Sequence, residues 1–268
     1  MSSNIEYASV SAIIPCYNST KTMERAVVSV WEQTLRPKEL ILVDDGSTDN
    51  SLELARVLQQ KYGSGFIEII ELGKNMGVSF ARNVGWNAAK GDYIALLDSD
   101  DSWHPMKLEI QYSFMKNNNQ YVLSGHSYSK YQNKNLFNSK ILDEFKIKYY
   151  SFKYLLLKNP FITPSFMFKN DIEIKFSEYD GGFEDHYFLM KISNRYGQIP
   201  SLQLPLASIY KNIYGESGLT SKMWYMQKGY FFIYKELYKS STITYISYLF
   251  LTFYSMIKYI RRLLKVYI

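Results

Sequence analysis

The sequence predicts an α/β domain with a mostly parallel sheet flanked by helices. Short apolar runs alternate with amphipathic segments through the first hundred residues, which is typical of βα units. The run at 93–97 is apolar throughout, as expected of a strand covered on both faces. With 268 residues, the chain is long enough for one large α/β domain or for a nucleotide-sized domain with an elaborated second half.

The individual elements follow from the spacing of the apolar residues. Continuous runs predict strands at 10–14, 40–43, 67–72, 93–97 and 121–124. Apolar residues at spacings of three and four predict helices at 22–34, from an N-cap at Asp49 to before Gly63, at 77–89 and at 106–115.

The pattern becomes less regular after Pro105. Residues 126–150 are polar and rich in Asn and Lys, and we expect a variable insertion there rather than a separate domain. Helical patterns cover 152–157 and 186–196. Four prolines are expected to mark breaks between the segments of this half: Pro160, Pro164, Pro200 and Pro205.

The net charge of +6 is concentrated at one end of the chain. Residues 1–210 hold 22 basic and 23 acidic side chains, whereas residues 211–268 hold 9 and 2. Because the near-neutral body offers no basic groove, a nucleic-acid-binding protein is the least favoured class. A basic, aromatic-rich end is typical of a segment that binds a membrane surface.

Other features of composition bear on location. The 25 Tyr and 16 Phe suit carbohydrate platforms or membrane interfaces, or reflect an A+T-rich gene. The lone Cys16 fits a reducing compartment, and the polar start of the chain predicts no signal peptide. His104, His126 and His186 have no ligand-like spacing, so we expect them at the surface or in loops.

Polar residues follow three of the predicted strands, where an open α/β sheet binds its ligands. These clusters are Pro15-Cys16-Tyr17-Asn18, Asp44-Asp45-Gly46-Ser47 and Asp98-Ser99-Asp100-Asp101. Taken singly, each acidic cluster could be a turn or a helix cap. Together they bring five carboxylates to one sheet edge, where a cation or bound donors must offset their repulsion. Carboxylates suit Mg²⁺ or Mn²⁺, which completes its shell with substrate phosphates, and no His/Cys spacing indicates zinc.

Four segments carry recognisable motifs: 10–18 (VSAIIPCYN), 39–49 (ELILVDDGSTD), 75–85 (NMG and ARNVG) and 91–101 (GDYIALLDSDD). In this order they resemble the donor-binding half of family 2 glycosyltransferases, closely over about 8–105 and more loosely over 160–220. The resemblance implies the GT-A fold, with a Rossmann-like sheet, and a nucleotide-sugar donor, usually a UDP-sugar. We expect three parts: a donor half at 1–125, an acceptor half with the catalytic base at 126–239, and an amphipathic helical tail at 240–268.

The resemblance also implies roles for the strand-end residues. Pro15 and Tyr17 form the wall against uracil and ribose, and Asp45 accepts the uracil N3–H. Asp98 contacts the ribose or the metal, and Asp100 is the direct ligand of Mn²⁺ or Mg²⁺. The set expected to contact the donor and its metal is Pro15, Tyr17, Asn18, Asp44, Asp45, Arg82, Asp98, Ser99, Asp100 and Lys211.

Two residues of that set are cationic. Arg82 holds the diphosphate or braces the acidic cluster, or else it is an ordinary surface arginine on a helix. Lys211 lies in Tyr210-Lys211-Asn212-Ile213, where many relatives carry Tyr-Arg-x-His. The chain therefore has a cation at this place but lacks the histidine that contacts phosphate or metal in some relatives.

Transfer of a sugar to a hydroxyl group needs a base. The segment Gly181-Gly182-Phe183-Glu184-Asp185 resembles the Glu-Asp motif that precedes a helix in the family. We assign the base to Asp185, with Glu184 as the second choice. Both carboxylates would also favour a helix N-terminus at this place, and the two explanations are compatible. A single base-assisted displacement inverts the anomeric centre, so an α-linked donor gives a β-linked product.

The end of the chain predicts an interfacial helix. Residues 240–257 carry no charge but are interrupted throughout by Ser, Thr and Tyr, and Lys258, Arg261, Arg262 and Lys265 follow. The stretch is shorter and more polar than a membrane span, whereas aromatic groups with adjacent basic residues suit an anionic membrane surface. The alternative is a helix that packs on the catalytic body or on a dimer partner.

Together these features predict an inverting, metal-dependent enzyme that binds peripherally to the cytoplasmic face of the plasma membrane. It would transfer a hexose (glucose, galactose or an N-acetylhexosamine) from a UDP-sugar to a lipid-pyrophosphate-linked saccharide in O-antigen, capsule or exopolysaccharide assembly. The alternatives are another nucleotide sugar, a soluble or protein-glycan acceptor, and a sugar-nucleotide-binding protein without turnover.

Overall fold

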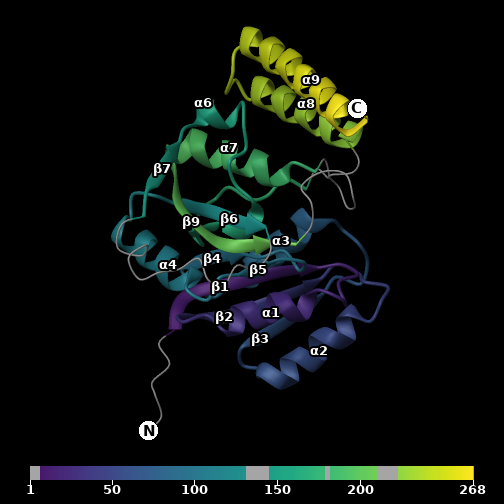
Figure 1. Ribbon diagram of the computed structural model, residues 1–268, viewed down its shortest axis with the longest axis vertical. Helices are drawn as coiled ribbons and strands as arrows, with labels where there is room; N and C mark the ends of the chain where they lie inside the picture. The colour runs from purple at the N-terminus through teal and green to yellow at the C-terminus, as the bar shows by residue number, and fades with distance from the viewer. Residues whose placement is uncertain (1–6, 131–144, 179–181, 211–222, 268) are drawn as a thin grey trace.

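The computed structural model describes residues 7–130, 145–178, 182–210 and 223–267 (Figure 1). In this part of the chain, one nine-stranded sheet has the order β3-β2-β1-β4-β8-β6-β9-β5, with β7 paired to β9. The first four strands in this order are parallel: β1 (Tyr7–Cys16), β2 (Arg36–Asp44), β3 (Ile67–Glu71) and β4 (Tyr93–Leu96). They confirm the parallel half of the α/β prediction.

Helices cover both faces of this parallel sheet. They are α1 (Met23–Trp31), α2 (Ser51–Tyr62), α3 (Val78–Ala88) and α4 (Lys107–Asn117), close to their predicted limits. Strand β1 shows why two cores form, because Ile13 packs with α3 whereas Ile14 packs on the opposite face with α1. Asp49 precedes α2 as expected, and its carboxylate accepts the Ser51 N–H at 3.0 Å, while Asn50 is the N-cap residue.

The second half extends the sheet with strands that the sequence pattern did not predict in full. They are β5 (Ser102–Trp103), β6 (Leu123–Lys130), β7 (Ile147–Tyr150), β8 (Met167–Lys169) and β9 (Ile199–Ile209). Both ends of the expected insertion at 126–150 are therefore strand, whereas 131–144 lie outside the described residues.

Strand β9 also corrects the expectation that Pro200 and Pro205 mark breaks, because both lie inside it. The ladder between β6 and β9 is irregular on both sides of the Ser127–Pro205 pair. A register shift at this point tolerates a residue that cannot donate a backbone hydrogen bond.

Helices α6 (Phe152–Leu155) and α7 (Glu184–Tyr196) lie above the second half of the sheet (Figure 1). The 3₁₀ turn η1 (Thr163–Ser165) contacts β4, β6 and β9. Helix α7 begins two residues before its predicted start, so Glu184 and Asp185 form its first turn. The histidine prediction is wrong at two positions, since His126 and His186 are fully buried.

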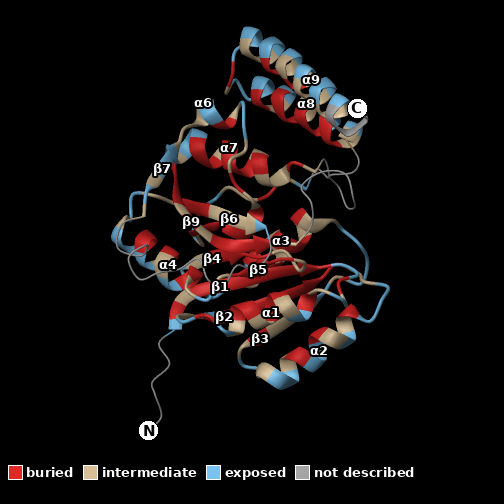
Figure 2. Ribbon diagram, viewed as in Figure 1, coloured by how far each residue is buried: buried red, intermediate tan, exposed pale blue. Residues whose placement is uncertain are grey.

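The C-terminal region forms two packed helices, α8 (Met223–Lys239) and α9 (Tyr245–Tyr267). Tyr230 and Tyr234 of α8 belong to the same core as Phe188 of α7, so α8 packs on the catalytic body. Helix α9 packs on α8, where Gln227 Nε2 donates to Ser255 Oγ at 2.8 Å. Figure 2 shows the inward face of α8 buried and the outer face of α9 exposed. The alternative of packing against the body, stated for residues 240–268, therefore applies to one face of α9.

Candidate active site

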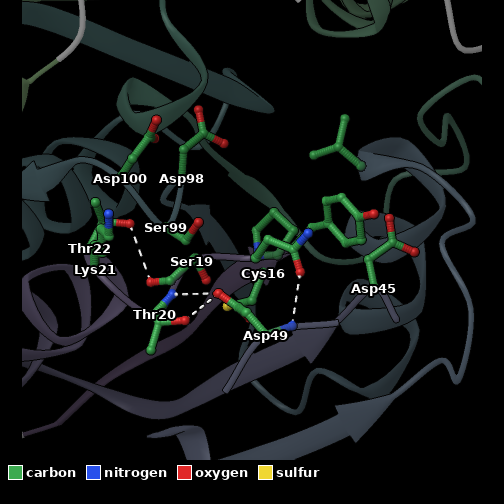
Figure 3. Close-up of a pocket in the computed structure, with 14 residues that line it drawn as sticks. Cys16, Ser19, Thr20, Lys21, Thr22, Asp45, Asp49, Asp98, Ser99 and Asp100 are labelled. Carbon is green, nitrogen blue, oxygen red and sulfur yellow. Dashed lines mark hydrogen bonds between the residues drawn. The ribbon is translucent and has the colours of Figure 1, made fainter. Parts of the chain in front are cut away.

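A pocket of about 790 Å³ opens at the carboxyl ends of β1, β2 and β4 (Figure 3). It is lined by Pro15, Cys16, Tyr17, Asn18, Ser19, Thr20, Lys21, Thr22, Asp45, Asp49, Val78, Asp98, Ser99 and Asp100. The three strand-end clusters thus converge as the topology predicts. The sequence pattern predicts only the starts of helices at three other places in the lining, and it does not indicate a site there. They are Ser19–Thr22, Asp49 and Val78.

Two described residues of the predicted set, Asp44 and Arg82, are not in the lining. Asp44 is buried beneath the turn that follows β2, where its Oδ2 accepts the Ser47 N–H at 3.1 Å. Arg82 lies behind the acidic cluster, and Lys211 lies outside the described residues. The two catalytic candidates, Glu184 and Asp185, also lie outside the lining and reach it through Arg82.

Asp45 is held by the loop that leads into α3. Its Oδ1 accepts the Met76 N–H at 2.7 Å and its Oδ2 accepts the Gly77 N–H at 3.0 Å. Burial raises the pKa of Asp45, and the two amide donors oppose that rise. Because each carboxylate oxygen has a second lone pair, Asp45 can still accept a hydrogen bond from a ligand in the pocket.

A glycine permits this close approach. Gly46 has φ +70°, and a Cβ at this position would lie 2.4 Å from the Lys74 carbonyl carbon. Only glycine lets the turn after β2 touch the loop before α3 in this conformation.

Asn18 joins the loop after β1 to the loop after β2. Its Oδ1 accepts the Thr48 N–H at 2.8 Å and the Asp49 N–H at 3.3 Å, while its own N–H donates to Ser47 Oγ at 3.0 Å. Its φ of 49° lies in the left-handed region, which asparagine tolerates better than most residues. Asn18 therefore joins two loops, and the neighbouring Tyr17 ring, 47% exposed, remains free to stack on a ligand.

Arg82 is a buried brace, which rules out the surface-arginine alternative. One guanidinium nitrogen lies 2.9 Å from Asp98 Oδ1 and the other lies 3.5 Å from Glu184 Oε1. Its side chain is only 5% exposed. A single cation thus links the end of the fourth parallel strand to the first turn of α7.

Asp185 is the carboxylate suited to accept a proton. Its Oδ1 accepts the His186 N–H at 2.7 Å and its Oδ2 accepts the Asn159 Nδ2–H at 3.3 Å. Burial and the neighbouring Glu184 raise the pKa of Asp185 to about 6, although Arg82 opposes the shift. A carboxylate with this pKa is ionised at neutral pH and is a stronger base than an ordinary aspartate.

Asp98 and Asp100 offer the hard oxygen ligands that a divalent ion prefers. Figure 3 shows both carboxylates on one side of the pocket, with Asp45 on the other. Asp98 is shared with Arg82, and no group of three or more His, Cys, Asp or Glu side chains in the described ranges is arranged to hold a metal alone. The residues fit an Mg²⁺ or Mn²⁺ ion that takes most of its ligands from a diphosphate and water.

Arg25 holds the acidic loop, residues 98–101, in place, and no pattern in the sequence indicated this role. Arg25 Nη2 donates to the Asp100 carbonyl oxygen, and its guanidinium lies 3.6 Å from the centre of the Tyr210 ring. The Tyr210 hydroxyl is hydrogen-bonded to Ser102 Oγ at 3.1 Å. Nearby, burial together with the two neighbouring loop aspartates raises the pKa of Asp101 to about 8.

A family model described as "Glycosyl transferase family 2" matches residues 11–172 of this chain. The chain belongs to glycosyltransferase family 2. The match covers β1 to β8 and therefore includes every residue that lines the pocket. It ends before Glu184 and Asp185, so their roles rest on the geometry of this chain.

Two of the curated relatives each match less than half of this chain. A cholesterol galactosyltransferase of Borreliella burgdorferi is 40% identical over 119 residues, which are 44% of this chain and 32% of the relative. The poly(ribitol-phosphate) β-N-acetylglucosaminyltransferase TarP of Staphylococcus aureus is 37% identical over 119 residues, 43% of this chain and 36% of TarP. The matches thus span about a third of each relative's length.

Solved structures share the fold over most of the chain. Residues 1–349 of S. aureus TarS, in complex with UDP-GlcNAc, superpose with a TM-score of 0.66 at 22% identity, covering 85% of this chain and 66% of that one. The mannosyltransferase PcManGT of Pyrobaculum calidifontis, in complex with GDP-Man and Mn²⁺, gives a TM-score of 0.64 at 16% identity, covering 87% and 65%. They confirm the GT-A fold.

Proposed function

We propose that the protein is an inverting, metal-dependent glycosyltransferase. It transfers a hexose, such as glucose, galactose or an N-acetylhexosamine, from a UDP-sugar to a lipid-pyrophosphate-linked saccharide during assembly of a surface polysaccharide such as O-antigen or capsule. The observation that carries the proposal is the buried Arg82, which joins the pocket carboxylate Asp98 to the carboxylate pair that contains Asp185. Arg82 thereby holds the donor site and the proposed catalytic base, Asp185, in a fixed arrangement.

The donor half, residues 1–125, supplies the nucleotide site. Tyr17 and Pro15 form the wall for the uracil and ribose rings, and Asp45 accepts the uracil N3–H with its remaining lone pairs. Asp100 and Asp98 would hold a divalent metal ion, which would supply positive charge to offset that of the diphosphate. The TarS complex with UDP-GlcNAc, whose fold matches, supports a uridine nucleotide at this site.

The acceptor half, residues 126–239, supplies the base. Asp185 takes the proton of the acceptor hydroxyl as the oxygen attacks the anomeric carbon on the face opposite the departing UDP. Glu184 instead lies 3.5 Å from a guanidinium nitrogen of Arg82, so its carboxylate is engaged by that cation. One displacement of this kind inverts the anomeric configuration.

The outer face of α9 is the proposed membrane contact. It carries a stripe of exposed apolar residues at helical spacing: Ile246, Leu249, Phe250, Phe253, Ile257, Ile260 and Leu264. The exposed Arg261 lies beside this stripe, where it can meet anionic headgroups. Among the described helices, none has an apolar run long enough to cross a bilayer. Peripheral binding to the cytoplasmic face would bring a lipid-linked acceptor close to Asp185.

The test is a transfer assay with the full chain. The protein and Mn²⁺ are incubated with a panel of UDP-hexoses and UDP-N-acetylhexosamines, with a synthetic GlcNAc-pyrophosphate-lipid as acceptor. We expect a mass gain of one sugar from one donor, a β-linked product from an α-linked donor, and no gain with Asp185→Asn. Binding of UDP and Mn²⁺ without transfer would refute the lipid-pyrophosphate acceptor, and failure to bind UDP would refute the donor assignment.

A second panel of acceptors tests the alternative acceptor classes. The printed names of two relatives point to a sterol and to a poly(ribitol-phosphate) chain as substrates of those proteins. Transfer to either of them, with none to the pyrophosphate lipid, would retain the donor assignment and replace the acceptor.

A further inference from the structure

Residues 155–157, at the end of α6, are bound by three different helices. Their carbonyl oxygens accept hydrogen bonds, in chain order, from His186 Nε2 at 2.7 Å, the Tyr234 hydroxyl at 3.0 Å and Lys258 Nζ at 2.8 Å. These donors belong to α7, α8 and α9 respectively. The amides of this segment donate to backbone carbonyls of residues 151–154, whereas its own carbonyls are bound by α7, α8 and α9.

Two of the three donors are shielded from water, whereas the carbonyl that Lys258 binds belongs to the exposed Leu157. His186 and Tyr234 are buried, and burial lowers the pKa of the Lys258 amine. The His186 ring must donate through Nε2, because a carbonyl oxygen can only accept. Loss of the His186 or the Tyr234 donor would leave a poorly hydrated carbonyl without its partner, which is costly and favours movement of the segment.

Asn159 follows residue 157 by two positions, and its side chain contacts the proposed base. Asn159 Nδ2 lies 3.3 Å from Asp185 Oδ2. The orientation of the amide is fixed, because Asn159 Oδ1 accepts the Phe161 N–H at 3.0 Å. The nitrogen therefore faces Asp185 and donates to it, while the His186 N–H holds the other carboxylate oxygen at 2.7 Å.

We propose that Asn159 is a positioning residue for Asp185, and that α7, α8 and α9 hold Asn159 in place through the carbonyl groups of residues 155–157. The inference rests on the proposed function, since it takes Asp185 as the base. It gives the two C-terminal helices a part in catalysis although neither reaches the pocket. It also links α9, which carries the proposed membrane contact, to the orientation of the base through Lys258.

The direct test is Asn159→Ala in the full chain, assayed with the pyrophosphate lipid. We expect kcat to fall about 10-fold or more, because a small displacement of a catalytic group is costly. The donor KM and the affinity for UDP should stay within about twofold, since the pocket is untouched. A kcat within twofold of the unsubstituted protein would overturn the inference.

The remote test compares two tyrosines of α8. Tyr234→Phe removes only the hydroxyl that binds residue 156, whereas Tyr238→Phe removes a hydroxyl from a ring that stacks on Tyr248 at the surface. We expect Tyr234→Phe to lower kcat about threefold and to speed hydrogen exchange at the amides of 155–159. Tyr238→Phe should change neither. Equal behaviour of the two variants would overturn the role of the C-terminal helices even if Asn159→Ala did not fold.

Asp185→Asn, measured alongside, separates the two proposals. Full transfer by Asp185→Asn would refute the base itself and the inference with it. Loss of transfer by Asp185→Asn, with full kcat in Asn159→Ala, would refute the inference alone.

Discussion

The Arg82 guanidinium lies 2.9 Å from the carboxylate of Asp98, and the two groups are positioned by consecutive elements of the chain. Arg82 comes from the middle of α3, and Asp98 follows β4. On its other side Arg82 reaches Glu184, at 3.5 Å. Three negative groups, counting Asp185, therefore surround one buried cation, and the electrostatics of donor site and base depend on it.

Replacing Arg82 with Met should therefore damage both stability and transfer. The substitution leaves buried carboxylates without their cation, which costs about 3 kcal/mol of unfolding free energy in comparable pairs. We expect transfer to fall at least about 100-fold, because Asp98 and Asp185 both lose a partner. Urea denaturation and kcat/KM measure the two effects.

Arg56→Met is the matched control for this change. Arg56 pairs with Glu71 at 2.8 Å, but both side chains are about half exposed. Its loss should leave both measurements unchanged within error, because solvent already screens that pair. Equal effects of the two variants would contradict the bracing role of Arg82.

The pH dependence of transfer should report Asp185. Its pKa is raised to about 6 by burial and by Glu184, against the opposing influence of Arg82. The base works when deprotonated, so kcat should rise with pH to a plateau, with a midpoint near 6. A profile that is flat from pH 5 to pH 8 would contradict the assignment.

The same shift has a defined sign for stability. Between the ordinary value of 3.8 and about 6, the folded protein holds a proton on Asp185 that the unfolded chain has released. The contribution of this group to the free energy of unfolding therefore falls as pH rises through that window. Asp185→Asn should remove this part of the pH dependence in urea denaturation.

Metal removal should affect nucleotide binding through Asp100. We expect EDTA to weaken UDP binding about 10-fold or more, because the ion joins the diphosphate to the protein. In Asp100→Asn, added Mn²⁺ should restore little of that affinity in isothermal titration calorimetry. Asp92→Asn is the control, since the exposed Asp92 immediately precedes β4 and lies at the opposite end of the strand. A similar response to Mn²⁺ in both variants would contradict the role of Asp100.

The sequence predicts the donor side well because its signals are local. Each parallel strand is an unbroken apolar run, and the polar residues that follow it must meet at one edge of the sheet. The positions of Asp45, Asp98 and Asp100 in the pocket follow from that rule alone. Asp44 shows its limit, since the neighbouring residue in the same turn faces the pocket and Asp44 does not.

The remainder depends on contacts between distant residues. Arg25 contacts the loop at Asp100 across 75 positions, and Asn159 reaches Asp185 across 26, so no spacing in the chain announces either pair. Strand β9 was missed because Pro200 and Pro205 argue against a central strand. The register shift beside Pro205 tolerates that proline, and Pro200 is the second residue of the strand. The pattern predicts one amphipathic helix in the tail, and α9 is a helix there, whereas its binding to a membrane stays a prediction. The packing of α8 beneath α9 depends on the three-dimensional core.

The exposed stripe on α9 should bind anionic vesicles, and Phe253 lies at its centre. Its side chain is 68% exposed, so burial in the headgroup region would remove a large apolar surface from water, worth about 2 kcal/mol. Phe253→Glu loses that gain and adds repulsion from anionic lipid, so we expect vesicle binding to fall at least about 10-fold in co-sedimentation.

Val57→Glu, at a 49% exposed position on α2, should bind like the unsubstituted protein. Vesicles of neutral phosphatidylcholine should bind the protein more weakly than vesicles that contain phosphatidylglycerol, because Arg261 beside the stripe then has no anionic partner. Equal binding of the two glutamate variants would place the membrane contact somewhere other than α9.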